Sequence, residues 1–243
     1  MVASAPPRIA AWPLAIPGER RIEVLSTDGT LLDGRLAVPE RASRVVVIAH
    51  PHPLYGGSMD DPVVRALARV ASERGAATLR FDFRGVGSSE GRHRGGDPEI
   101  GDLLGAVGVA ARALPGATVS LAGYSFGSWV ALQAARASMV SESRAPIDRV
   151  AMLAPALGLF AYDELPRHAG ARRFDGAVAI VAGDRDGLSD PVRARVLAAR
   201  IGASIAVLHG EDHFFSRTRR RVAELLAPFL LGARARIDEG DFA

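Results

Sequence analysis

A serine flanked by glycines interrupts an apolar stretch in the middle of the chain. Residues 121–132 read LAGYSFGSWVAL, so Ser125 stands two positions from both Gly123 and Gly127. The residues before the serine predict a strand, and those after it predict a helix. A serine on such a turn is held in a strained conformation with its hydroxyl exposed, and glycines at this spacing let strand and helix approach closely. The pattern therefore indicates a nucleophilic serine, although so short a motif also arises by chance.

A nucleophilic serine needs a general base, for which histidine is the usual residue. Three histidines follow Ser125 in the chain: His168, His209 and His213. His168 lies in an irregular stretch, and His209 ends a predicted strand, where a local hydrogen bond would account for it. His213 lies in the loop HGEDHFF, from which its ring can reach over the serine. We therefore favour His213 as the base, ahead of His209.

The base in turn needs a carboxylate, which we expect in the loop GDRDGLSDP at residues 183–191. Asp190 directly precedes a proline, where its side chain would cap the following helix. Asp184 stands at the end of a predicted strand, a common place for a turn-forming aspartate. We therefore favour Asp186 as the acid and keep Asp184 as the alternative.

An oxyanion formed on the substrate needs two backbone N–H donors. The N–H of Phe126, at the start of the predicted helix, is the first. The second should come from the loop HPHPLYGGS at residues 50–58. The two prolines of this loop have no N–H, which leaves His52, Leu54 and Tyr55. We favour Leu54, because the prolines stiffen the loop before it and the glycines relax it afterwards.

Strands and helices alternate between residues 44 and 231, which predicts a mostly parallel sheet covered by helices on both faces. A hairpin at 20–26 and 31–38 should add an antiparallel edge. The further strands are expected at 44–49, 76–83, 117–122, 149–154, 177–182 and 205–208, and the helices at 61–74, 99–114, 125–138, 191–201 and 217–231.

The chain shows no repeat and no break in composition, so we expect a single domain. It should span residues 19–233, with an N-terminal extension at 1–18 and a C-terminal tail at 234–243. The irregular region at 156–175 should hold a short helix and form a modest lid.

Composition narrows the classes of function. The 243 residues include no cysteine, which excludes a disulfide framework, a thiolate metal site and a cysteine nucleophile. We expect no metal at His50 and His52, because their loop has no companion cysteine or evident carboxylate ligand. No stretch is long enough for a membrane span, and the apolar N-terminal run is broken by Pro13 and Pro17, so we expect a cytoplasmic protein without a signal peptide.

The high isoelectric point of about 10.1 does not indicate a nucleic-acid partner, since the net charge is only +3. Every basic residue is arginine, which keeps its proton up to high pH. Few groups can therefore release a proton and cancel the small positive net charge as the pH rises. We accordingly expect neither a nucleic-acid nor a membrane partner, and a homodimer stays open.

Five segments together resemble the α/β-hydrolase superfamily. They are AHPHPLYGGSMDDPVV, LRFDFRGVGSSEG, LAGYSFGSWVAL, VAGDRDGLSDP and GEDHFF, they follow the family's order, and they span residues 49–215. The chain is most similar to the small branch with little lid, akin to dienelactone hydrolases and related bacterial esterases. The resemblance implies an eight-stranded sheet, a triad of Ser125, Asp186 and His213, hydrolysis of a carboxylic ester or thioester, and no cofactor. Dienelactone hydrolases use a cysteine nucleophile, so the resemblance does not extend to that activity.

The expected function is hydrolysis of small to medium carboxylic esters through an acyl-enzyme. The alternatives are an acyl-CoA thioesterase, acyl transfer to an alcohol or to peroxide, and a binding protein without activity. The arginine-rich segment SRTRRR at 216–221 reads as a solvated face, but it would favour an anionic leaving group such as coenzyme A if it lies near the site. The residues expected to line the site are Tyr55, Leu157, Leu159, Phe160, Leu188 and Phe214.

Overall fold

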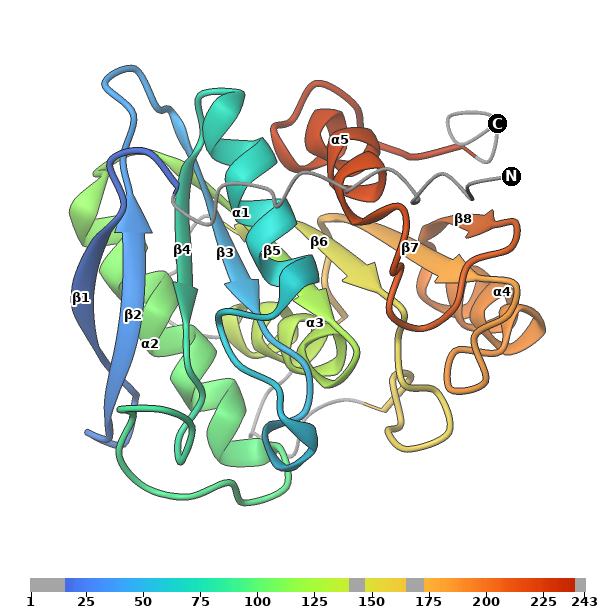
Figure 1. Cartoon of the computed structure of the whole chain (residues 1–243), viewed down its shortest axis with the longest axis horizontal. Helices are drawn as coiled ribbons and strands as arrows, with labels where there is room; N and C mark the ends of the chain where they lie inside the picture. The colour runs from blue at the N-terminus through green and yellow to red at the C-terminus, as the bar shows by residue number, and fades with distance from the viewer. Residues whose placement is uncertain (1–15, 140–146, 165–172, 239–243) are drawn as a thin grey trace, which may run out of the picture.

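The computed structural model describes residues 16–139, 147–164 and 173–238 (Figure 1). Most of the expected extension at 1–18, part of the tail at 234–243 and part of the insertion at 156–175 therefore lie outside the described residues. Among the described helices, none is long and apolar enough to cross a membrane.

The described residues form one eight-stranded sheet in the order β1-β2-β4-β3-β5-β6-β7-β8. The strands are β1 (Arg20–Leu25), β2 (Leu31–Ala37), β3 (Arg44–Ala49), β4 (Ala77–Phe81), β5 (Thr118–Tyr124), β6 (Ile147–Leu153), β7 (Ala177–Gly183) and β8 (Ser204–Leu208). Strand β2 is antiparallel to both β1 and β4, and all the other pairs are parallel. The predicted parallel sheet with an antiparallel edge is therefore confirmed.

Five α-helices cover the two faces of the sheet in the described residues. They are α1 (Pro62–Glu73), α2 (Asp97–Ala113), α3 (Phe126–Ser138), α4 (Pro191–Ile201) and α5 (Arg219–Leu230), and a short 3-10 helix η1 (Pro53–Tyr55) was not expected. Helices α1 and α5 pack on one face, and α2, α3 and α4 pack on the other (Figure 1). Their ends lie within a few residues of the predicted positions.

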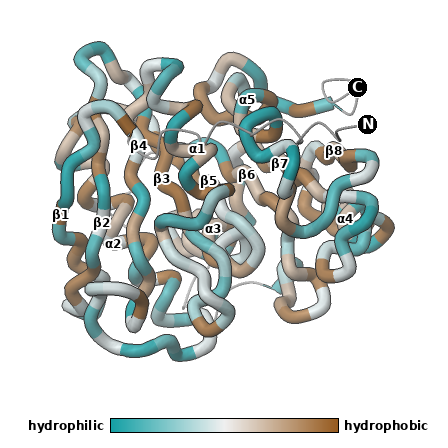
Figure 2. The backbone as a smooth tube through the Cα atoms, in the orientation of Figure 1, coloured by the Kyte–Doolittle hydropathy of each residue, from teal (hydrophilic) through white to brown (hydrophobic). Residues whose placement is uncertain are grey.

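The core lies on both sides of the central strands, as β3 illustrates. Val45 and Val47 face the layer of α2, α3 and α4, whereas Val46 and Ile48 face α1 and α5. All four side chains are buried, and Figure 2 shows hydrophobic residues along this strand. Burial on both faces explains why the strand is a continuous apolar run instead of an alternating one.

The insertion at 156–175 contains turns and bends in its described part, and the short helix expected there is absent from that part. Three α3 side chains, spaced about one helical turn apart, hold it down. Trp129, Gln133 and Arg136 donate hydrogen bonds to backbone carbonyls of residues 161–164. This portion of the insertion is therefore strapped onto α3.

A buried arginine joins three separate parts of the fold. Arg84, in the loop after β4, lies 2.6 Å from Asp102 of α2 and 2.9 Å from Asp28 in the β1–β2 turn. It also donates to the Ser26 hydroxyl. Asp102 is fully buried, so its charge depends on this guanidinium for compensation.

We expect Arg84→Gln to lower the free energy of unfolding by about 3–5 kcal/mol, because Asp102 would remain buried without its cation. Urea denaturation monitored by circular dichroism measures this loss. Arg200→Gln is the control, since it removes an exposed ion pair with Asp163 worth about 0.2–1 kcal/mol. Equal losses in the two variants would contradict the role assigned to Arg84.

Candidate active site

The Ser125 turn is strained, and close packing of backbones surrounds it. Ser125 has φ 54° and ψ −116°, values that are uncommon for a residue other than glycine. A Cβ atom on Gly123 would lie 2.1 Å from the Gly127 carbonyl oxygen, and one on Gly127 would lie 2.4 Å from that of Ala49. Both positions therefore require glycine, as the spacing predicts.

Buried hydroxyls support this turn from behind. The Ser128 hydroxyl donates to the Ser125 carbonyl at 2.5 Å and lies 2.9 Å from the hydroxyl of Tyr162. The Tyr162 hydroxyl also accepts the N–H of Ala156 at 2.8 Å. Because Tyr162 is buried, this network joins the serine turn to the start of the insertion.

Side chains from the loops after β7 and β8 meet the serine. His213 Nε2 lies 3.0 Å from Ser125 Oγ, and His213 Nδ1 lies 2.8 Å from Asp186 Oδ2. The other Asp186 oxygen accepts N–H bonds from Leu188 and Ser189. An ionised carboxylate can only accept, so Nδ1 carries the imidazole proton and Nε2 is free to accept the serine proton.

The alternative acid and base also form a pair, but with each other. Asp184 Oδ2 lies 2.7 Å from His209 Nδ1, and Asp184 Oδ1 accepts the N–H of Gly210. The His209 side chain is 94% exposed, and no described contact links it to Ser125. His168 lies outside the described residues. The two loops thus carry two aspartate–histidine pairs, of which the Asp186 pair contacts the serine.

The expectation that Leu54 supplies an oxyanion donor is wrong in this structure. Helix η1 turns the Leu54 N–H back onto the His52 ring, 3.2 Å from Nδ1, and the Tyr55 N–H donates to the His52 carbonyl. Leu54 itself is exposed outside the pocket. Within the described part of the chain, the N–H groups of His52 and Phe126 have no hydrogen-bond acceptor, and both residues line the pocket beside Ser125.

His50 anchors the loop that carries His52. Its ring is fully buried; Nε2 accepts the N–H of Phe83 at 3.0 Å, and Nδ1 donates to the Pro51 carbonyl at 2.6 Å. Burial lowers the pKa of His50 from its ordinary 6.5 to about 3. Both ring nitrogens are thus used in holding the loop, and the ring is neutral.

A hollow of about 460 Å³ opens over Ser125. Its walls include Tyr55, Leu159, Phe160, Leu188 and Phe214, all named from the sequence. The sixth expected residue, Leu157, does not line this hollow. It is buried and lines a neighbouring groove instead.

Sequence reasoning missed several further residues of the pocket wall, among them Asp61 and Tyr124. Burial raises the pKa of the Asp61 carboxyl, although the N–H groups at the start of α1 and the charge of Arg219 oppose the rise. Both residues could have been placed from their positions, since Tyr124 directly precedes the serine and Asp61 caps the helix after the His52 loop.

Comparison with known proteins decides the family. The model of the alpha/beta hydrolase domain matches residues 42–227. The chain belongs to the alpha/beta hydrolase family. A curated but uncharacterized protein of Rickettsia prowazekii is 38% identical over 90 residues, which are 37% of this chain and 38% of that protein. This alpha/beta hydrolase therefore spans well under two thirds of that relative's length.

Two solved structures resemble this alpha/beta hydrolase over most of its length. One is an alpha-beta serine hydrolase homologue from Coxiella burnetii, 27% identical, with a TM-score of 0.73 and coverage of 87% of this chain and 97% of that chain. The other is XC6422 from Xanthomonas campestris, described as an a/b serine hydrolase without lid. It is 26% identical, with a TM-score of 0.75 and coverage of 91% of this chain and 97% of that chain. These similarities support the assignment of this chain as a hydrolase.

Because the pKa of His50 is lowered in the folded protein, the free energy of unfolding should depend on pH. Between pH 6.5 and about 3 the unfolded chain binds a proton at this residue and the folded chain does not. Stability should therefore fall as the pH drops below 6.5, by up to about 1.4 kcal/mol per pH unit from this residue. His50→Gln should remove this contribution.

The test is urea denaturation of both proteins between pH 8 and 4. The difference in unfolding free energy between the native protein and the variant should be constant above pH 7 and should shrink as the pH falls below 6.5. A difference that stays constant over the whole range would show that His50 is not held neutral.

Proposed function

We propose that this alpha/beta hydrolase cleaves carboxylic esters through a covalent acyl-enzyme on Ser125. The observation that carries the proposal is the unbroken chain of contacts from Ser125 Oγ to His213 and on to Asp186, at 3.0 Å and 2.8 Å. A serine hydroxyl becomes a useful nucleophile when an adjacent base takes its proton and a carboxylate orients that base. The free N–H groups beside the serine add the means to stabilise an oxyanion.

The proposed reaction proceeds in two steps. His213 Nε2 takes the Ser125 proton as Oγ attacks the ester carbonyl, and Asp186 stabilises the resulting imidazolium. The N–H groups of Phe126 and His52 donate to the tetrahedral oxyanion. His213 then returns the proton to the departing alcohol, which leaves the acyl group on Ser125. A water molecule, deprotonated by the same histidine, attacks the acyl-enzyme and releases the acid.

The pocket favours small to medium esters with apolar groups. Its walls carry Tyr55, Leu159, Phe160, Leu188 and Phe214, which suit a hydrocarbon substituent. The arginine-rich start of α5 gives little support to an acyl-CoA substrate. Arg220 is paired with Glu73 and Glu224, and Arg219 donates to the Phe214 carbonyl.

We expect Ser125→Ala to lower kcat for p-nitrophenyl butyrate by about 10³-fold or more, because no other group replaces the nucleophile. His213→Ala should cause a comparable loss. His209→Ala is the matched control, since it removes the exposed member of the second pair, and kcat should change little. A fluorophosphonate probe should label Ser125, as peptide mass spectrometry can verify. Full turnover by Ser125→Ala would overturn the proposed function.

A second pair of variants isolates the His52 N–H. His52 has φ −59°, which suits proline, so His52→Pro deletes the N–H while the backbone angle is kept. His52→Ala removes the same ring but retains the N–H. We expect kcat of the proline variant to be about 10²–10³-fold below that of the alanine variant. Circular dichroism and thermal melting check that both are folded. Equal kcat values would exclude this N–H as an oxyanion donor.

A further inference from the structure

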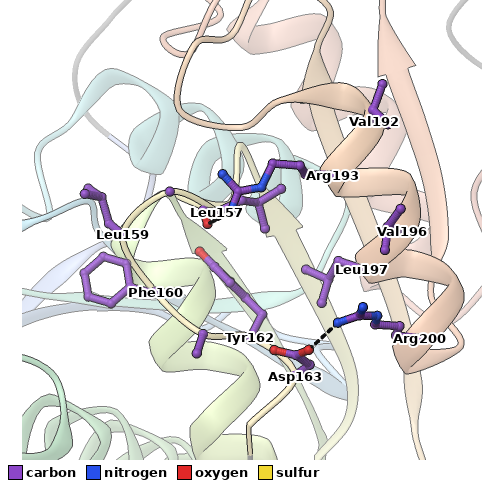
Figure 3. A pocket seen from close by; sticks show the side chains of 12 residues that line it. Leu157, Leu159, Phe160, Tyr162, Asp163, Val192, Arg193, Val196, Leu197 and Arg200 are labelled. Atoms are coloured by element: carbon purple, nitrogen blue, oxygen red, sulfur yellow. Dashed lines mark hydrogen bonds and ion pairs between the residues drawn. The ribbon is translucent and has the colours of Figure 1, made fainter.

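A second groove adjoins the pocket over Ser125. It has a volume of about 540 Å³ and lies between residues 157–163 and α4 (Figure 3). Leu159 and Phe160 belong to the walls of both hollows. The two hollows therefore adjoin at these two side chains.

The α4 side of the groove carries exposed apolar side chains. Val192 is 68% exposed and Val196 is 49% exposed, and Leu197 reaches from the same helix toward Tyr162 (Figure 3). Leu159, on the facing segment, is 58% exposed. Apolar side chains that gather over a hollow are typical of a site for an apolar group.

The groove also holds an arginine without an acidic partner. Arg193 extends from α4 and donates to the Leu157 carbonyl at 2.7 Å, and no carboxylate of the described residues forms an ion pair with it. Arg200, further along the groove, is instead neutralised by Asp163 at 2.6 Å. A guanidinium with donors to spare favours a carboxylate at this point.

We propose that the groove binds the remote end of an extended ester, a linear chain that terminates in a carboxylate. The chain would cross Leu159 and Phe160, lie against Val196 and place its carboxylate on Arg193. This inference rests on the proposed esterase function and specifies its substrate class. The carboxylate belongs to either the acyl or the alcohol part of the ester. Two series of substrates, one for each part, show which of the two carries it.

The first series consists of mono-p-nitrophenyl esters of dicarboxylic acids with four to ten carbons, and the second of ω-acetoxy carboxylic acids of similar length. Each is compared with the neutral ester of equal chain length. For the optimal length in one series, kcat/KM should exceed that of the neutral ester by about tenfold, the usual value of a charge-assisted hydrogen bond. No preference for the carboxylate in either series would overturn the proposal.

Arg193→Gln should abolish this preference, measured as the ratio of kcat/KM for the carboxylate ester to kcat/KM for the neutral ester of equal length. Arg195→Gln is the matched control: it removes the same charge from the same helix, but residue 195 lines a different depression. The control should retain the preference. If both variants lose it equally, long-range charge explains the effect and Arg193 is not the binding group.

Val196→Asn tests the apolar part of the groove. It should lower kcat/KM for p-nitrophenyl octanoate about fivefold relative to the acetate, because chain methylene groups lose an apolar contact. Val38→Asn, at an exposed valine after β2, should leave this ratio unchanged. If the two variants have equal ratios of kcat/KM for the octanoate to kcat/KM for the acetate, the chain does not contact Val196 and this part of the proposal is wrong.

A binding measurement separates failure of this inference from failure of the proposed function. Isothermal titration calorimetry measures the dissociation constant of monomethyl octanedioate from two proteins. One is the Ser125→Ala variant, and the other is the double variant that carries Ser125→Ala and Arg193→Gln. Binding that is about tenfold weaker in the double variant supports the groove even if the native protein cleaves no ester. Equal binding by both proteins would contradict it.

Discussion

The close contact of three backbones at the Ser125 turn is the constraint on which this molecule depends. Strand β5 must reverse into α3 within one residue while α3 also packs against the end of β3. Only hydrogen atoms fit at positions 123 and 127, where a Cβ would meet a backbone oxygen at 2.1 Å and 2.4 Å. This packing maintains the positive φ of Ser125 and places its hydroxyl at the N-terminus of α3, beside an N–H that no helical carbonyl can accept.

Parallel strands bring the remaining groups to the same edge of the sheet. The loops after β3, β7 and β8 deliver His52, Asp186 and His213 to a serine that follows β5. Each loop is preorganised by its own hydrogen bonds. Asp186 is held by two backbone N–H groups, and the His52 loop is held by the neutral ring of His50. Such fixed geometry would lower the reorganisation needed when charge develops in the proposed reaction. The second pair, Asp184 and His209, has comparable contacts but lies at the surface.

Most of the fold could be predicted because its signals are local. Runs such as RVVVIA are buried on both sheet faces, and helices α1 and α4 each begin at a proline that follows a capping aspartate. The insertion after β6 was less predictable. Its described conformation depends on hydrogen bonds with Trp129, Gln133 and Arg136 of α3. Strand β6 separates these residues from the insertion in the sequence, so no local pattern indicates the contact.

By itself the sequence determined the sheet, the strained serine turn and the short set of acids, bases and N–H groups that could serve it, since these follow from periodicity, glycine spacing and chain order. Only the tertiary structure decided which members of that set meet. Asp184 and Asp186 are two residues apart, yet their carboxylates bind different histidines, and η1 occupies the Leu54 N–H while that of His52 stays open. The direction in which a side chain or an N–H leaves a loop depends on the hydrogen bonds of the whole turn, which residue types and spacing do not encode.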